Sequence, residues 1–176
     1  MKRIKLISAI ALLSSLGVCS AADDAAKKNP NEVFTPEQVL PSGADSTTST
    51  NPYTGESGPA RKGTVAATLN NIALLNNLLS EKESPENEAK IETITEAIAS
   101  LLPSLRVIGV FDMFTPEEWL STKDQQGRAL AAILYLQKYP QSITPSIKRH
   151  LERIRDQTKN KIILEAIDLA LRGAKY

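Results

Sequence analysis

From residue 61 onward, apolar side chains recur at the 3.6-residue spacing of an amphipathic helix. The apolar stripe of the first predicted helix is formed by Val65, Leu69, Ile72 and Leu79. Leu74 and Leu78 lie on a different face of the same helix, so we expect this helix to have two apolar neighbours. Asn76 falls inside the stripe, where a buried amide needs a hydrogen-bond partner. We interpret it as forming a hydrogen bond within the domain; a seam with another protein is the alternative.

Local start signals divide the rest of this region into further helices. Ser84-Pro85-Glu86, Thr115-Pro116-Glu117-Glu118 and Thr144-Pro145 each place a capping hydroxyl before a proline at the first helical position. Asn160 is the expected cap of the last helix. Residues 129–136 are apolar nearly all round, which predicts a central, buried helix.

Residues 104–114 are the ambiguous part of the pattern, because they leave little polar surface. Pro103 is expected to kink or end the helix before them. The segment is compatible with a buried helix, an irregular buried connector or an extended stretch. We favour the first two, since the sequence offers no second strand to pair with it. Residues 63–176 are therefore predicted to form an all-α domain, a compact bundle or short superhelix of five to six helices.

Residues 23–62 have a different composition. The stretch 42–59 is dominated by Ser, Thr, Asn, Gly and Pro, so residues 23–62 are predicted to be a disordered tether. One island, residues 34–40, has the sequence Phe-Thr-Pro-Glu-Gln-Val-Leu and echoes residues 114–120. Both segments combine a hydrophobic staple with a capping box, which predicts a short helix start near 34–40. Either helix starts are simply stereotyped, or the island docks on a partner or on its own domain.

Residues 1–22 have the features of a bacterial secretory signal peptide. A basic segment precedes an apolar run that is shorter than the ~20 residues of a membrane-spanning helix. The run ends in Cys19-Ser20-Ala21-Ala22, and cleavage after Ala21 or Ala22 fits this pattern. Alternatively, Leu16-Gly17-Val18-Cys19 resembles a lipoprotein signal, which implies lipidation of Cys19. Val18 departs from that pattern, because a smaller residue is expected there.

Composition limits the chemistry that the chain can perform. With one Cys and one His, the common zinc sites and thiol catalysis are not expected. The glycines form no dinucleotide-binding or Walker spacing, so no cofactor is predicted. His150 borders an apolar stripe and has no local partner, which indicates a packing or surface role. The carboxylates that a hydrolase would use are Asp112, Glu117 and Glu118, but turn and capping roles are preferred for them. We therefore expect that the protein is not an enzyme.

The charges are balanced overall, with 21 basic and 20 acidic residues. Binding to nucleic acid is consequently not expected. Along the chain the charge is uneven, because residues 81–96 are rich in glutamate and residues 148–161 in lysine and arginine. One interpretation is that these two segments attract each other within the fold. The other is that Lys148, Arg149 and Arg153 form a basic face for an acidic protein partner or for anionic lipid headgroups.

These features predict an exported bacterial interaction protein, an accessory or structural subunit of a cell-envelope or secretion assembly. The periplasm is the expected location, with an outer-membrane lipoprotein or an extracellular form as alternatives. Three other functions stay open: a periplasmic carrier of a small apolar ligand, a secreted virulence-type factor and a carboxylate-based hydrolase. No transmembrane helix is expected in the mature chain, so membrane association requires a lipidated Cys19.

Intact mass spectrometry of the protein recovered from bacteria tests the targeting prediction. The mature N-terminus is expected at Ala22 or Asp23, because small residues precede both positions. A mature chain that begins at Cys19 and carries acyl mass would contradict soluble export. A chain that keeps residues 1–22 would contradict the signal peptide itself.

Overall fold

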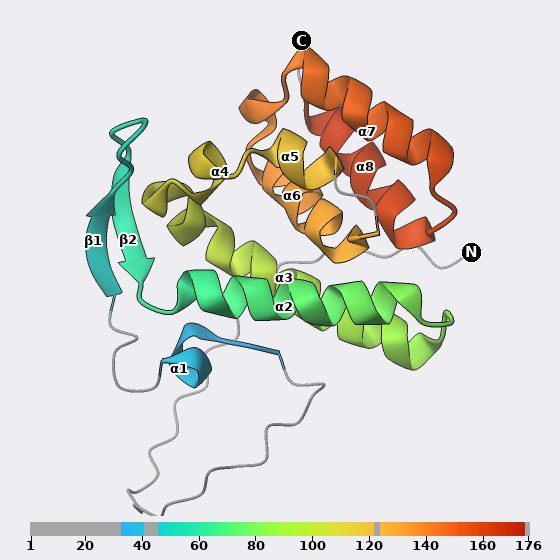
Figure 1. Ribbon diagram of the computed structural model, residues 1–176, viewed down its shortest axis with the longest axis horizontal. Helices are drawn as coiled ribbons and strands as arrows, with labels where there is room; N and C mark the ends of the chain where they lie inside the picture. The colour runs from blue at the N-terminus through green and yellow to red at the C-terminus, as the bar shows by residue number, and fades with distance from the viewer. Residues whose placement is uncertain (1–32, 41–45, 122–123, 175–176) are drawn as a thin grey trace, which may run out of the picture. The chain divides into compact units, whose positions relative to one another are not determined.

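Figure 1 shows the computed structural model of the chain, which describes residues 33–40, 46–121 and 124–174. These ranges contain eight α-helices, one short 3-10 helix and a two-stranded sheet. The mostly helical architecture confirms the predicted fold class in its coarse form. The prediction of an all-α fold with five to six helices is wrong, because a sheet is present and the helices are more numerous. The predicted signal peptide, with Cys19, lies outside the described residues.

The described elements follow one another in a simple order. The first three are α1 (Pro36–Val39), β1 (Ser46–Thr50) and β2 (Ser57–Arg61). Two long helices come next, α2 (Thr64–Ser80) and α3 (Pro85–Ile108). They are followed by α4 (Val110–Met113), α5 (Pro116–Ser121) and α6 (Gln126–Lys138). The 3-10 helix η1 (Pro140–Ser142) leads to α7 (Pro145–Gln157) and α8 (Lys161–Gly173). Within the described ranges, none of these helices is both long and apolar enough to cross a membrane.

The helix starts that the sequence predicts are present with their caps. Ser84, Thr144 and Asn160 accept hydrogen bonds from backbone N–H groups in the first turns of their helices, at 3.0 to 3.3 Å. Thr115 and Glu118 form the expected capping box, in which the Thr115 N–H donates to the Glu118 carboxylate at 2.7 Å. These side chains satisfy N–H groups that have no partner inside the helix. These helices therefore begin at defined residues.

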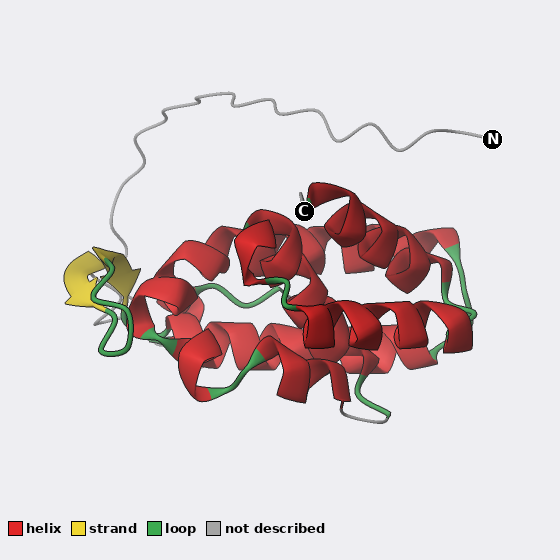
Figure 2. Cartoon of the chain, turned by 90° about the horizontal axis from the view of Figure 1, so that it is seen from above, coloured by secondary structure: helices red, strands yellow, loops and turns green. Residues whose placement is uncertain are grey.

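Helix α6 is the centre of the core. All residues from 129 to 136 are buried, which confirms the prediction of a central helix. It packs against α2, α3, α5 and α8. The side chains of Leu130, Ile133 and Leu136 are fully buried at these contacts. Figure 2 shows the helices gathered into one body, with the hairpin at one end of it.

The ambiguous segment 104–114 is helical. Helix α3 does not end at Pro103 but continues to Ile108. It stops at Gly109, whose φ of 84° lies in the left-handed region that glycine adopts without strain. Helix α4 begins directly afterwards, so the chain turns a corner between two helices.

Residues 46–61 form an antiparallel hairpin, so the prediction of a disordered tether is wrong for this part of the chain. The register pairs Thr48 with Pro59. Ala60 is 5% exposed, and a Cβ placed on Gly58 would lie 3.1 Å from Val107 Cγ2 of α3. One face of the hairpin thus packs on α3. This contact supplies the support that an isolated two-stranded hairpin lacks in water.

The island at 34–40 forms α1, with the predicted capping box between Thr35 and Gln38. It docks on its own domain. The fully buried Asn71 side chain of α2 accepts from the Phe34 N–H at 2.8 Å and donates to the Phe34 carbonyl at 2.9 Å. Glu37 forms an ion pair with Arg61 of β2. A backbone hydrogen bond is the main cause of the lowered pKa of Glu37, and Arg61 adds to it.

The apolar stripe predicted for the first helix is buried over only part of its length. Ile72 and Leu79 lie in the core, whereas Val65 and Leu69 are 38% and 53% exposed. Asn76 has the hydrogen bond within the domain that we expected, since its Oδ1 accepts from the Gly127 N–H at 2.7 Å. This bond joins α2 to the first turn of α6.

Replacing Gly127 tests the close contact between α2 and α6. A Cβ at this position would lie 2.6 Å from the Ile72 carbonyl oxygen and 2.7 Å from the Asn76 nitrogen, both backbone atoms. Gly127→Ala is expected to lower the free energy of unfolding by about 1–3 kcal/mol, because the two helices must move apart. Chemical denaturation followed by circular dichroism measures this loss. The matched control is Gly173→Ala, whose Cβ would meet nothing nearer than Pro140 Cβ at 3.7 Å. Equal stability of both variants would contradict the close contact.

Candidate functional site

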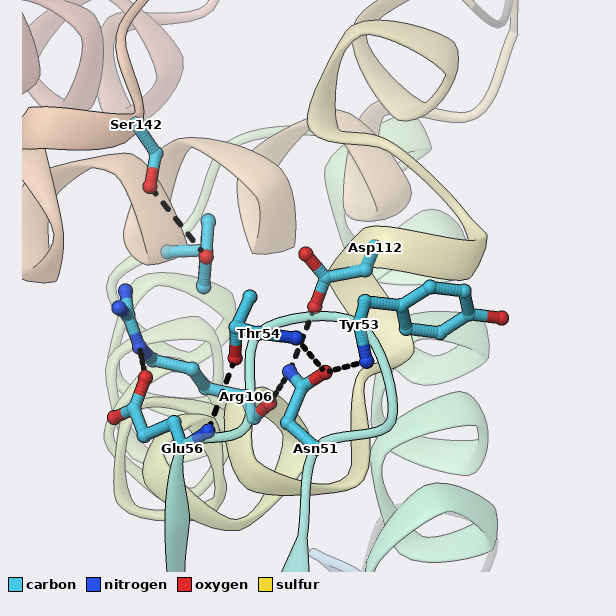
Figure 3. Close-up of polar contacts among 8 residues, drawn as sticks. Asn51, Tyr53, Thr54, Glu56, Arg106, Asp112 and Ser142 are labelled. Carbon is cyan, nitrogen blue, oxygen red and sulfur yellow. Dashed lines mark hydrogen bonds and ion pairs between the residues drawn. The ribbon is translucent and has the colours of Figure 1, made fainter.

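Asn51 is a buried side chain at the junction of the hairpin with α3 and α4 (Figure 3). Its Oδ1 accepts from the backbone N–H groups of Tyr53 and Thr54, at 2.8 and 3.1 Å. Its Nδ2 donates to the Arg106 carbonyl at 2.7 Å and to Asp112 Oδ2 at 2.8 Å. Both donors and both acceptor positions of the amide are used. Asn51 therefore fixes the hairpin turn to the end of α3 and to α4 at once.

The local sequence explains why these groups meet. Arg106 lies in the last turn of α3, and its carbonyl accepts from the Gly109 N–H at 3.0 Å as well as from Asn51. The left-handed Gly109 then turns the chain, so that α4 brings Asp112 to the same corner. Asn51 begins an Asx-type turn, in which an Asn side chain accepts from the backbone two residues ahead. A Cβ at Gly109 would lie 3.1 Å from Tyr53 Cδ2, so glycine also allows the Tyr53 ring to pack at this corner.

Arg106 provides a second link between the hairpin and the helices. Its Nε donates to Glu56 Oε2 at 2.6 Å, and its guanidinium carbon lies 4.4 Å from the centre of the Tyr139 ring. Such a cation–π contact favours the charged guanidinium. The hydrogen bond to Glu56 is the main cause that raises the pKa of Arg106. Burial raises the pKa of the Tyr139 hydroxyl, although the nearby Arg106 charge opposes this shift. Arg106 is thus charged and Tyr139 is neutral at neutral pH, and both contribute through their placement in the structure.

A cluster of aromatic rings lies beside this junction. Phe111 and Tyr135 are stacked, with ring centres 3.9 Å apart and an angle of 23° between the planes. Trp119 approaches Phe111 at 5.2 Å, and Tyr139 approaches Tyr135 at 5.0 Å. Offset and tilted ring pairs of this kind contribute beyond the area that they bury. The cluster joins α4, α5 and α6 at this corner.

Three large apolar side chains stay exposed at this corner, and we call them the α4 patch. Tyr53 of the hairpin turn is 57% exposed, Met113 at the end of α4 is 59% exposed and the adjoining Phe114 is 53% exposed. The sequence predicts Phe114 as a staple against Trp119, yet half of Phe114 faces solvent while Trp119 is buried. Aromatic and methionine side chains are enriched in protein interfaces.

The three residues predicted as a basic face all lie on α7. Arg149 and Arg153 are exposed and one helical turn apart. Lys148 is only partly exposed and lies 4.0 Å from the Glu152 carboxylate one turn later. The structure therefore leaves Arg149 and Arg153 as the exposed cations of this set.

The acidic and basic segments meet at one exposed ion pair, where Lys161 Nζ lies 3.9 Å from Glu83 Oε2. Within α3, Lys90 lies 2.8 Å from Glu86 and lowers the pKa of that carboxyl group through a hydrogen bond. Exposed pairs of this type contribute little to stability. Attraction between the two segments is present in the fold, but it does not hold the fold together.

The candidate carboxylates do not converge on one cleft. Asp112 binds Asn51, and Glu118 serves the capping box. Glu117 accepts from the Ser146 hydroxyl at 2.7 Å, and His150 Nδ1 lies 3.7 Å from the same oxygen. This arrangement differs from that of a catalytic nucleophile and its base. The Ser146 hydroxyl donates to the Glu117 carboxylate and not to the imidazole, and His150 Nδ1 lies 3.0 Å from the Ser146 carbonyl oxygen.

This group clamps α5 to α7, and the sequence analysis missed it because its members lie far apart along the chain. Among the residues that the structure describes, no three His, Cys, Asp or Glu side chains are grouped so as to hold a metal ion.

Two surface clefts bear on the hypothesis of an apolar-ligand carrier. The cleft between α2, α3 and α8 holds about 30 Å³, room for little more than a water molecule. The other is an open depression of about 420 Å³, lined by Arg155, Asp168, Leu171 and Arg172. Ligand pockets are usually enclosed, mainly apolar and ~300–1,000 Å³ in volume. Neither cleft supports the carrier hypothesis.

Residues 55–138 match a family model described as a domain of unknown function (DUF7709). The match covers slightly less than half of the chain, from β2 to the end of α6. It includes Glu56, Arg106 and Asp112 but neither Asn51 nor helix α7 with Arg149. No curated protein and no solved structure matches the chain. The chain is thus similar to this family over its central helices, and its function has to be argued from the surface and the site.

Replacing Asn51 tests the junction. Asn51→Asp removes the donor to the Arg106 carbonyl and places a second carboxylate against Asp112. At neutral pH the free energy of unfolding is expected to fall by about 2–4 kcal/mol, because like charges meet and the Arg106 carbonyl keeps only its hydrogen bond from the Gly109 N–H. Urea denaturation followed by Trp119 fluorescence measures the loss.

The double variant Asn51→Asp/Asp112→Asn is the matched control. It is expected to recover part of the loss, since the new amide can donate to the carboxylate at position 51. An Asn51→Asp variant with the wild-type denaturation midpoint would contradict the assigned role.

Proposed function

We propose that the chain is an exported bacterial α-helical interaction protein, an accessory or structural subunit of a cell-envelope or secretion assembly. The α4 patch is the observation that carries this proposal. Tyr53, Met113 and Phe114 each leave more than half of their surface in water. Burying apolar surface against a partner is favourable by ~25 cal/mol per Å².

The rigid base of the patch also favours docking. Asn51, Arg106 and Asp112 are already engaged in hydrogen bonds that hold the corner together. A surface that is ordered before binding loses less conformational entropy when a partner arrives. The polar groups of this site therefore hold the α4 patch in place, and this role does not require them to take part in a reaction.

Export is supported by the targeting pattern of residues 1–22. The periplasm is the location that this pattern favours, and lipidation of Cys19 is the alternative that would attach the protein to a membrane. The exposed Arg149 and Arg153 offer a second contact to an acidic segment of the same partner.

Photocrosslinking in living bacteria tests the proposal. A photoreactive phenylalanine analogue in place of Phe114 is expected to give one discrete adduct with another protein. Leu169 of α8 is the matched control, because it is 49% exposed and lies outside the patch. Tyr53→Ala/Met113→Ala is expected to reduce the Phe114-site adduct about five- to thirtyfold, which corresponds to a loss of ~1–2 kcal/mol of binding free energy. Equal labelling at positions 114 and 169, or none at 114, would contradict the docking role.

A further inference from the structure

The pairing of the hairpin fixes which backbone groups of β1 point outward. The Asn51 N–H donates to the Glu56 carbonyl at 2.8 Å, and the Asn51 carbonyl accepts from the Gly55 N–H at 2.9 Å, so the backbone groups of Asn51 point toward the β2 side of the hairpin. Hydrogen-bonded and non-hydrogen-bonded pairs alternate along an antiparallel ladder. Three steps along the register, Thr48 and Pro59 therefore form a non-hydrogen-bonded pair. Thr48 directs its backbone N–H and C=O away from β2.

On the outward edge of β2, α3 contacts the backbone of Pro59. This agrees with the alternation of hydrogen-bonded and non-hydrogen-bonded pairs along the ladder. Pro59 has no N–H, which costs nothing at a position whose nitrogen points away from β1. Its carbonyl accepts from the Ser104 hydroxyl of α3 at 3.3 Å. The free edge of the sheet is thus that of β1, which lies on the outer side of the hairpin in Figure 1.

The outward groups of β1 are open to another strand. In the described part of the chain, no other element forms a backbone hydrogen bond with Ser46, Thr48 or Thr50. Every residue of β1 is exposed except Ser49, which is partly exposed. Edge strands are usually protected by a charge, a proline or a bulge. The sequence of β1, Ser-Thr-Thr-Ser-Thr, has neither charge nor proline, and threonine favours extended backbone.

We propose that β1 pairs with β1 of a second copy of this chain, antiparallel and about a two-fold axis at Thr48. In this register Thr48 meets its own equivalent and exchanges two backbone hydrogen bonds with it. Ser46 meets Thr50 of the other copy, and both are residues whose backbone groups point outward. The result is a four-stranded sheet in the order β2-β1-β1-β2. This pairing is independent of the envelope role proposed above.

The chemistry of the edge selects a second copy as the occupant. At a two-fold contact each residue meets itself or a symmetric neighbour, so a charge near the axis would be repelled by its equivalent. The uncharged β1 avoids this repulsion, and its hydroxyls offer both donors and acceptors across the strands. A foreign strand is usually selected by side-chain pockets beside the edge. Neither of the two clefts described above includes a residue of β1.

Sedimentation velocity of the purified mature chain over a concentration series tests the proposal. The wild-type chain is expected to sediment as a dimer at the higher concentrations. Thr48→Lys and Thr48→Glu are each expected to weaken dimerisation about tenfold or more, because like charges then face each other. An equimolar mixture of the two variants is expected to regain the dimer. Thr48→Val is the matched control, since it keeps the backbone N–H and an uncharged branched side chain, and it is expected to dimerise like the wild type.

Thr48→Pro provides a second test that leaves the hairpin's own ladder intact. It removes only an outward N–H, so circular dichroism is expected to be unchanged while the dimer is lost. Tyr53→Ala/Met113→Ala is expected to remain dimeric, which separates this edge from the α4 patch. A wild-type chain that is monomeric at every concentration would overturn the proposal. So would a Thr48→Lys variant that dimerises like Thr48→Val, a mixture that fails to recover the dimer, or a monomer whose β1 edge binds a different peptide instead.

Discussion

The carboxamide of Asn51 is the interaction on which the N-terminal half of the fold depends. It is 1% exposed and makes four hydrogen bonds, two within its own turn and two to the helices. A buried amide with one partner missing would cost ~1–3 kcal/mol, so each of the four contacts matters to the stability of this corner. Because the hairpin has little apolar surface of its own, this side chain and the Arg106–Glu56 pair add to its packing on α3 in fixing its position.

The same constraint places the surface that we associate with function. The turn held by Asn51 carries Tyr53, and the helix held through Asp112 carries Met113. The stacked Phe111 and Tyr135 rings support this corner from the core side. Structure and proposed function are therefore linked at one point: the groups that lock the hairpin also order the exposed apolar side chains. The open edge of β1 belongs to the same hairpin, which thus offers two different surfaces to partners.

Local signals in the sequence were enough to predict much of the helical part. Thr115 and Ser84 cap their helices as expected, because a hydroxyl before a proline acts within one turn. The central helix at 129–136 followed from its apolar composition. The hairpin was missed, because its Ser/Thr-rich sequence is stabilised by contact with α3 and not by apolar residues of its own.

The candidate site was not predictable for the same reason. Asn51 and Asp112 lie far apart in the chain, and neither has a neighbour in sequence that marks it as half of a pair. Glu117 and His150 are a second example of partners brought together only by helix packing. Val65 and Leu69 have the spacing of a core stripe, but the helices that cover α2 leave them exposed. Periodicity predicts which face of a helix is apolar, and the number of neighbouring helices decides how much of that face is buried.

Hydrogen–deuterium exchange of residues 46–61, compared between the wild-type chain and Asn51→Ala, tests the central claim most directly. In the wild type, the amides of β1 that pair with β2 are expected to be protected, because Asn51 holds the hairpin on the core. In Asn51→Ala these amides are expected to exchange fast while those of α6 stay protected. Wild-type hairpin amides that exchange as fast as an unstructured peptide, or hairpin protection that survives in Asn51→Ala, would contradict the account.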